Sequence, residues 1–131
     1  MLRKVLAIAS GVVVAMLIIM ATEWVGHRIA PGPMPSDAAS EDMRIVPVGA
    51  MLAVIFAWFL GTLGGGAVAN RVARLRWPAW AIAGLVLLGA LIQFATARHP
   101  VWMMVAGVAA PLLAGWLVSR EAPRADREAA A

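Results

Sequence analysis

Four long apolar stretches, separated by short polar segments, set the hydrophobic pattern of this chain. Each is close to the length of about 20 mainly apolar residues that an α-helix needs to cross the hydrocarbon core of a bilayer. The pattern therefore predicts an all-α fold, a membrane-embedded antiparallel four-helix bundle that forms one domain over residues 1–118. The predicted spans cover residues of about 5–26, 46–71, 78–97 and 101–118.

The segments outside the spans differ in length and composition. Residues 28–45 include the run Pro31-Gly32-Pro33-Met34-Pro35, which resists helix formation, and we expect them to form an extended extracytoplasmic loop. Residues 119–131 mix charges with Ala and are expected to form a disordered cytoplasmic tail. The first span follows Arg3 and Lys4 as a signal peptide would, but no small-x-small cleavage site follows it, which favours an uncleaved anchor.

The start of the second helix has two readings that the sequence leaves open. Ser36 and Ser40 are candidate N-caps, and a helix that starts at Ser40 would have Pro47 in its second turn and bend there. A helix that starts near Arg44 would have Pro47 in its first turn, where proline costs little.

Small residues recur at every fourth position of the second stretch, which is the spacing of one helix face. Grooves of this kind allow two helix backbones to approach closely in a membrane, as in GxxxG packing. A straight helix overshoots by about 40° in each step of four, so the series is expected to spiral across at least two neighbours and make this helix the hub of the bundle. The series consists of Gly49, Ala53, Ala57, Gly61, Gly65, Ala69 and Ala73, and a shorter one in the first span consists of Ala7, Gly11 and Ala15.

Composition and charge support a membrane location. Hydrophobic residues make up 63% of the chain and charged residues 14%, so a water-exposed surface cannot be built from it. The basic residues flank the spans instead of forming a basic face, which argues against a nucleic-acid partner and leaves the lipid bilayer as the expected one. Eight Lys and Arg residues fall in the N-terminus, second connection and tail, against three in the other two connections. The positive-inside rule then predicts cytoplasmic termini, in a bacterial inner membrane.

Polar residues of the types that transfer protons, bind substrates or ligate metals lie near the extracytoplasmic ends of the first and third spans. Glu23 and His27 lie four residues apart on one helix face, where they either form an interfacial pair, provide a proton-coupled or substrate-binding carboxylate, or ligate a metal. Two imidazoles and a carboxylate satisfy a zinc ligand count, but no spacing brings the two histidines together, so no metal is expected. The candidate polar cluster is Glu23, His27, Gln93, Arg98 and His99. An interhelical hydrogen bond is the simpler role for Gln93.

Enzymatic motifs are absent from the sequence. There is no cysteine, no Ser-His-Asp set and no HExxH motif, and Gly64-Gly65-Gly66 is not a phosphate loop because it lies inside an apolar span. The chain is therefore expected not to be an enzyme and to need no cofactor. Asn70 and Arg71 are interpreted as the C-terminal cap of the second helix, with positive charge at its negative end.

Three features resemble small bacterial four-span membrane proteins of unknown function: the basic start, the Glu23-x-x-Gly26-His27 end of the first span, and Gly61-x-x-Gly64-Gly65-Gly66-x-x-Ala69. This resemblance covers the whole chain and implies the fold without an activity. The chain is also similar in size and span number to small multidrug resistance transporters, whose first span carries an essential carboxylate. Here Glu23 lies near the boundary, the first loop is longer and Tyr is absent.

Two functions follow as expectations. The first is a structural or accessory membrane subunit that packs through its small-residue helix faces, as a homo-oligomer or with a membrane-protein partner. The alternative is a small proton- or cation-coupled transporter that uses Glu23 near the outer membrane boundary.

Overall fold

A computed structural model describes residues 1–29 and 46–121, and within them the chain is all-α. Four helices follow one another: α1 (Leu2–Ile29), α2 (Val48–Ala73), α3 (Pro78–Thr96) and α4 (Val101–Arg120). Each lies within about three residues of the span expected from hydropathy, and all four are long and apolar enough to cross a membrane. Residues 28 and 29 of the expected loop belong to α1, and residues 119 and 120 of the expected tail belong to α4. The rest of the loop, residues 30–45, and the tail from residue 122 lie outside the described residues, as do the candidate caps Ser36 and Ser40.

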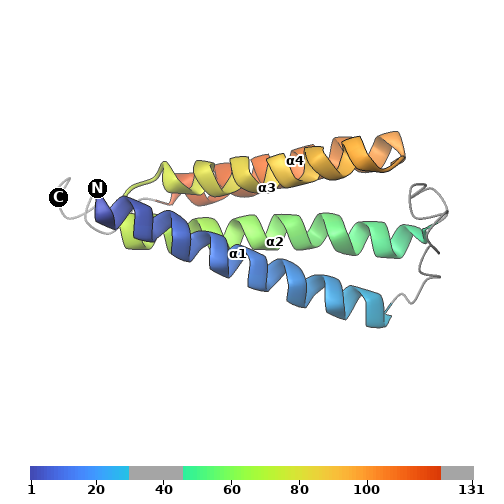
Figure 1. The fold of residues 1–131 in the computed structure, drawn as a ribbon, viewed down its shortest axis with the longest axis horizontal. Helices are drawn as coiled ribbons and strands as arrows, with labels where there is room; N and C mark the ends of the chain where they lie inside the picture. The colour runs from blue at the N-terminus through green and yellow to red at the C-terminus, as the bar shows by residue number, and fades with distance from the viewer. Residues whose placement is uncertain (30–45, 122–131) are drawn as a thin grey trace.

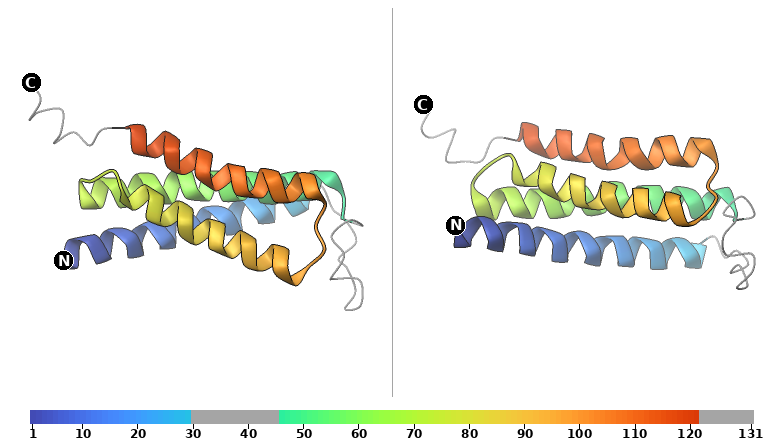
Figure 2. Two further views of the ribbon diagram at one scale, coloured as in Figure 1. Left: turned by 90° about the horizontal axis from the view of Figure 1, so that it is seen from above. Right: turned by 45° about the horizontal axis from the view of Figure 1, so that its top comes forward.

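The four helices lie side by side along one long axis (Figure 1). Helices α2 and α3 each contact the other three, whereas α1 and α4 share no contact within the described helices. Most of the contact surface of α1 is on α2, and only a small part of it is on α3. The start of α1 and the end of α4 lie at the same end of the molecule (Figure 2).

The α1–α2 seam, the contact between these two helices, is built from small residues around Gly11 and Gly65, and Ile18 and Ile19 of α1 contact Gly64 and Gly61 farther along it. The buried residues of α1 are Ala7, Gly11 and Ala15, the shorter small-residue series. A Cβ added to Gly11 would lie 2.8 Å from both the Ala69 Cβ and the Gly65 carbonyl oxygen. One added to Gly65 would meet the Gly11 carbonyl oxygen and lie 2.7 Å from the Ala15 Cβ. The two backbones are therefore in direct contact, and neither glycine has room for a side chain.

The longer small-residue series follows α1 farther than a straight-helix estimate allows. Gly61 and Gly65 contact α1, Ala69 does so through Gly11, and Ala53 does so through Gly26, whose added Cβ would lie 2.5 Å from the Ala53 Cβ. Rows of residues four apart run obliquely to a helix axis, so a neighbour that crosses obliquely, as α1 does in Figure 1, stays on the same row. The first member, Gly49, is exposed.

A second row on α2 faces α3 and α4. A Cβ on Gly66 would lie 3.2 Å from the Ala79 Cβ and 3.7 Å from a methyl group of Val118, and the ring of Trp58 lies 5.8 Å from that of Phe94, edge to face. Helix α2 therefore uses one row of residues for α1 and another for the remaining helices, which explains its central place.

Helix α4 approaches its neighbours at two glycines on either side of Pro111. A Cβ on Gly107 would lie 2.6 Å from the Phe94 ring and 2.8 Å from that of Trp58, and one on Gly115 would lie 2.8 Å from the Ala83 Cβ. The helix continues through the buried Pro111. Because both glycines lack a side chain, side chains of α2 and α3 pack directly against the backbone of α4.

Neither reading of the start of α2 matches the structure, in which this helix begins at Val48. Pro47 immediately precedes the helix, and its carbonyl oxygen accepts hydrogen bonds from the amides of Ala50 (3.0 Å) and Met51 (3.2 Å). Proline at this position loses no hydrogen bond, because the first amides of a helix have no partner inside it.

The expected capping role of Asn70 is wrong. Helix α2 continues to Ala73 and ends with Arg74 in the left-handed region (φ 58°), where the amides of Arg74 and Leu75 both donate to the Asn70 carbonyl oxygen. The buried Asn70 side chain instead forms hydrogen bonds with α3 and α4. Its Oδ1 accepts from the Ala79 amide at 2.9 Å, and its Nδ2 donates to the Val118 carbonyl oxygen at 3.5 Å. Asn70 thus caps the start of α3 from a neighbouring helix and donates a hydrogen bond to a carbonyl oxygen near the end of α4.

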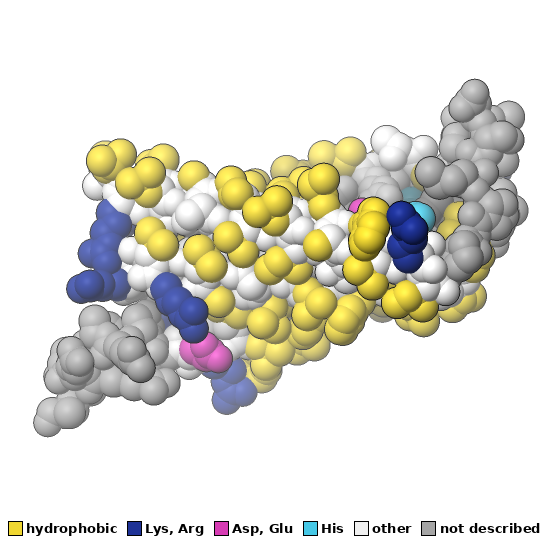
Figure 3. All heavy atoms as spheres, turned by 90° about the horizontal axis from the view of Figure 1, so that it is seen from below, with side chains coloured by type: hydrophobic (Ala, Val, Ile, Leu, Met, Phe, Trp, Pro, Cys, Tyr) yellow, Lys and Arg dark blue, Asp and Glu magenta, His cyan; other side chains and the backbone are white. Residues whose placement is uncertain are grey.

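Many large apolar side chains are exposed, and on the face shown in Figure 3 they cover the length of the bundle while charged side chains lie near its two ends. Leu17, Met20 and Val105 are each more than 60% exposed, which suits a lipid environment and not an aqueous one. At one end the Arg3 side chain donates to the Val72 carbonyl oxygen at 2.8 Å, which places a cation at the negative end of α2. Arginines also stack on tryptophans: Arg28 lies 4.9 Å from the centre of the Trp24 ring, and Arg120 lies 4.5 Å from that of Trp116.

Candidate functional site

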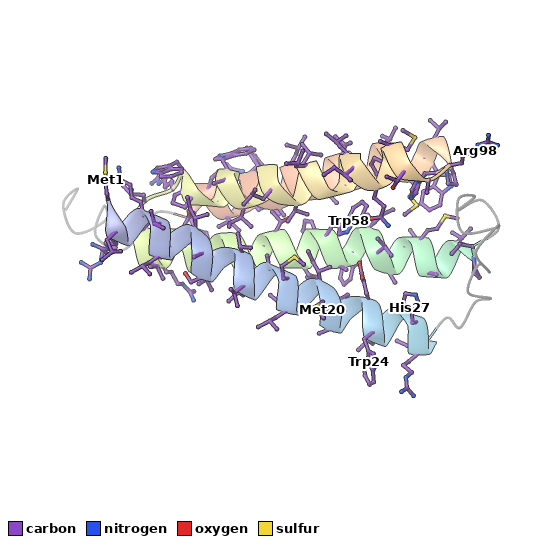
Figure 4. The ribbon with its side chains drawn as sticks, viewed as in Figure 1. Met1, Met20, Trp24, His27, Trp58 and Arg98 are labelled. Atoms are coloured by element: carbon purple, nitrogen blue, oxygen red, sulfur yellow. The ribbon has the colours of Figure 1, made fainter. Side chains whose placement is uncertain are left out.

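Glu23 and His27 lie one turn apart at the end of α1, but their side chains do not pair. The His27 Nδ1 donates to the Glu23 backbone carbonyl oxygen at 2.8 Å, which is a contact within one helix. The half-buried Glu23 carboxylate has no hydrogen bond or ion pair with any residue that the structure describes. Trp24 projects from the opposite side of α1 to His27 (Figure 4). The two side chains interact electrostatically, but no hydrogen bond or salt bridge joins them.

His99 lies in the turn between α3 and α4 and is held by its own segment. Its Nδ1 donates to the Ala97 carbonyl oxygen at 2.8 Å, and its ring meets the Phe94 ring edge to face, with 5.1 Å between centres. The other ring nitrogen, Nε2, is buried without a hydrogen-bond partner among the described residues. Arg98 is exposed and lies on the far side of the bundle from His27 (Figure 4).

Gln93 does not make the interhelical hydrogen bond proposed for it. Its backbone carbonyl oxygen accepts from the Thr96 hydroxyl at 3.1 Å and from the Ala97 amide at 3.1 Å, but its side-chain amide bonds to no described residue. The amide lies instead on the wall of a cleft between α1 and α3.

We call this feature the α1–α3 cleft. It has a volume of about 250 Å³ and an apolar lining apart from Gln93. Three α1 residues, Val12, Met16 and Ile19, face three α3 residues, Leu85, Gly89 and Gln93, and Trp58 of α2 also lines it. The helices meet more closely at its inner edge, where Ala15, Ala69 and Ile82 form a buried cluster. One pattern in the sequence indicates this cleft. Its lining positions on α3 are three and four residues apart, as on one helix face, and the last of them is the polar Gln93.

The five candidate residues therefore do not form one site. Glu23 and His27 belong to α1, Gln93 borders the α1–α3 cleft, and Arg98 and His99 belong to the α3–α4 turn. Within the described residues, no group of three or more His, Asp and Glu side chains could hold a metal ion. The arrangement offers separate hydrogen-bonding groups at one end of an apolar bundle, and an apolar cleft with one amide.

Comparison of the chain with family models, with curated proteins and with solved structures found no match in any of the three.

Proposed function

We propose that this chain is a non-enzymatic structural or accessory subunit of a membrane, an antiparallel four-helix bundle with both termini in the cytoplasm of a bacterial cell. In this proposal the small-residue faces hold the bundle together, and its exposed apolar faces contact lipid and either a second copy or another membrane protein.

The observation that carries the proposal is the composition of the interior. Among the described residues, the buried polar side chains are Thr62 and Asn70, and Asn70 is used to join the ends of three helices. The remaining interior is Ala, Gly and apolar side chains in close contact. Transport sites inside membranes use polar or ionisable groups that line a path. An interior of this kind supports packing over translocation.

The charge distribution supports the proposed orientation. Arg3, Lys4, the arginines after α2 and Arg120 lie at the end of the bundle that holds the start of α1, whereas Arg28 and Arg98 lie at the other. The natural absence of cysteine allows a direct test with single-cysteine variants. We expect Thr96→Cys to react with a membrane-impermeant maleimide on intact cells, and Glu121→Cys to react only after permeabilisation. The reverse pattern would overturn the orientation.

The function itself is tested by the mass of the complex. The full chain, extracted with a mild detergent and measured by native mass spectrometry, should run as a stoichiometric complex with a second copy or with another membrane protein. A lone chain at all concentrations would contradict the subunit role.

The alternative, a proton- or cation-coupled transporter, is favoured by one observation, the half-buried Glu23 carboxylate that makes no hydrogen bond or salt bridge with a described residue. Reconstituted vesicles with a pH-sensitive dye separate the two functions. The subunit role predicts equal and negligible proton flux for the wild type, for Glu23→Gln, and for Glu121→Gln, a control carboxylate at the other end. A flux that Glu23→Gln alone abolishes would replace the proposed function with the alternative.

A further inference from the structure

The end of the bundle that holds the start of α1 carries positive charge that the described residues do not balance. Lys and Arg side chains are prominent at this end in Figure 3. Residues 122–131 contain two Arg, one Asp and one Glu, so they add no net charge. Among the described residues, Glu121 is the acidic residue at this end, and the basic ones are Arg3, Lys4, Arg71, Arg74, Arg76 and Arg120.

Three of these residues, Arg3, Arg71 and Arg74, form what we call the arginine cluster. The Arg3 Nε donates to the Val72 carbonyl oxygen at 2.8 Å, which carries the start of α1 to the end of α2. Arg71 and Arg74 lie on either side of Val72 in the chain, and Arg74 is the C-cap residue of α2. The contact between Arg3 and Val72 therefore brings three exposed arginines to one helix end.

The arginine cluster has unused hydrogen-bond donors and no counter-charge. Apart from the bond to Val72, the three side chains make no hydrogen bond or salt bridge with a described residue. The negative end of a helix is equivalent to about half an elementary charge, which cannot neutralise three guanidinium groups. Because a guanidinium group matches the oxygens of a phosphate with parallel N–H donors, a phosphate is an anion that suits this cluster.

Apolar side chains beside the cluster favour a lipid over a soluble anion. Val5 is 63% exposed, and Val72 and Leu75 are each 37% exposed. Arg3 precedes the long apolar stretch of α1, so it lies at headgroup depth when that stretch spans the hydrocarbon core. A phospholipid places its phosphate at that depth and its acyl chains against the neighbouring apolar side chains. A nucleic acid or an acidic peptide would leave those side chains uncovered.

We propose that the arginine cluster binds the phosphate of one anionic glycerophospholipid, with its acyl chains lying against Val5 and Val72. A zwitterionic headgroup would bring its own cation to three arginines, whereas an anionic one does not. Each basic residue near an anionic lipid surface contributes about fivefold in affinity. This inference rests on the membrane placement of the bundle and not on the subunit role.

Arg120 provides a matched control for the cluster. It lies at the same end of the bundle and carries the same charge, but its guanidinium group stacks on Trp116, 4.5 Å from the ring centre. Arg120→Gln therefore removes one positive charge from this end without altering the cluster. Arg71→Gln and Arg74→Gln remove side chains that contact no described residue through a hydrogen bond or salt bridge, so both variants should fold. Arg3→Gln also removes the hydrogen bond to Val72.

The test is native mass spectrometry of the full chain in detergent, titrated with phosphatidylglycerol or with phosphatidylcholine that has the same acyl chains. The wild type should bind one phosphatidylglycerol per chain, with about tenfold lower affinity for phosphatidylcholine. Arg3→Gln, Arg71→Gln and Arg74→Gln should each lower the affinity for phosphatidylglycerol about fivefold, and Arg120→Gln should leave it unchanged. A large excess of inorganic phosphate should not displace the lipid. Circular dichroism checks that each variant is helical.

Four results would overturn the proposal. The first two are no retained lipid and equal affinity of the wild type for the two lipids. The third is a loss in Arg120→Gln as large as in Arg71→Gln and Arg74→Gln, which would indicate diffuse attraction by the net charge. The fourth is displacement of the lipid by inorganic phosphate, which would assign the cluster to a free anion. The subunit role is judged separately, from the mass of the complex without added lipid.

Discussion

The α1–α2 seam and the α1–α3 cleft show how differently one helix can meet two neighbours. Along the seam, glycines lie opposite glycine and alanine, and a Cβ on Gly65 would meet the carbonyl oxygen of Gly11. Along the cleft, Gly89 has nothing within 4 Å of an added Cβ, and space remains between α1 and α3. A glycine in an apolar helix therefore marks a close contact only where atoms of a neighbouring helix occupy the space that its Cβ would take.

Gly65→Leu should have the largest effect, because it breaks the seam. The leucine must displace the backbone of α1, and overpacking of this kind costs about 3 kcal/mol. We expect a clear fall in the melting temperature in detergent, measured by circular dichroism. Gly84→Leu, with the same chemical change in open space, is the control, and an unchanged melting temperature for Gly65→Leu would refute the close contact.

Asn70→Ala should have the next largest effect. It leaves the buried Ala79 amide without its acceptor and removes a donor from the Val118 carbonyl oxygen, at a cost of about 1–3 kcal/mol. Thermal unfolding measures this loss, and Thr62→Val is the matched control because the buried Thr62 hydroxyl has no partner among the described residues. Equal destabilisation by both variants would show that Asn70 acts only by filling space.

Arg74→Gly should stabilise the protein by about 1 kcal/mol. Arg74 adopts a left-handed conformation (φ 58°) at the end of α2, which glycine adopts without steric cost. The prediction sharpens the comparison because this turn sets the position of α3 relative to α2. A lower melting temperature for Arg74→Gly would mean that the arginine side chain contributes more than its backbone costs.

Gly89→Leu should have the smallest effect on stability, within about 1 kcal/mol and in the stabilising direction, because leucine is the better helix former and fills empty space. Its melting temperature, compared directly with that of Gly65→Leu, measures the difference between cleft and seam. Comparable destabilisation by the two variants would remove the distinction between them.

Hydropathy predicted the helices well because a membrane span needs a fixed length of apolar residues, which the pattern displays directly. Period-four spacing predicted that Gly11 and Gly65 lie on groove faces for a different reason, because residues four apart share one face of a helix. The rest depends on the rotation of each helix about its axis, which the pattern does not fix. Glu23, Gln93 and His99 were expected at one depth, yet they have different surroundings, and Asn70 caps a helix that begins eight residues later.

The unequal helix lengths have a consequence for the bilayer around the bundle. Helix α1 has 28 residues and is about 42 Å long, whereas α3 has 19 residues and is about 28 Å long. The difference is made up of polar turns, because α1 carries Arg3 and Lys4 at its start and Glu23, His27 and Arg28 at its end. The apolar part of α1 between Lys4 and Glu23 has 18 residues and is about 27 Å long, so a membrane that fits α3 also fits this part of α1. The charged ends of α1 would then reach the headgroup region on both sides of the bilayer.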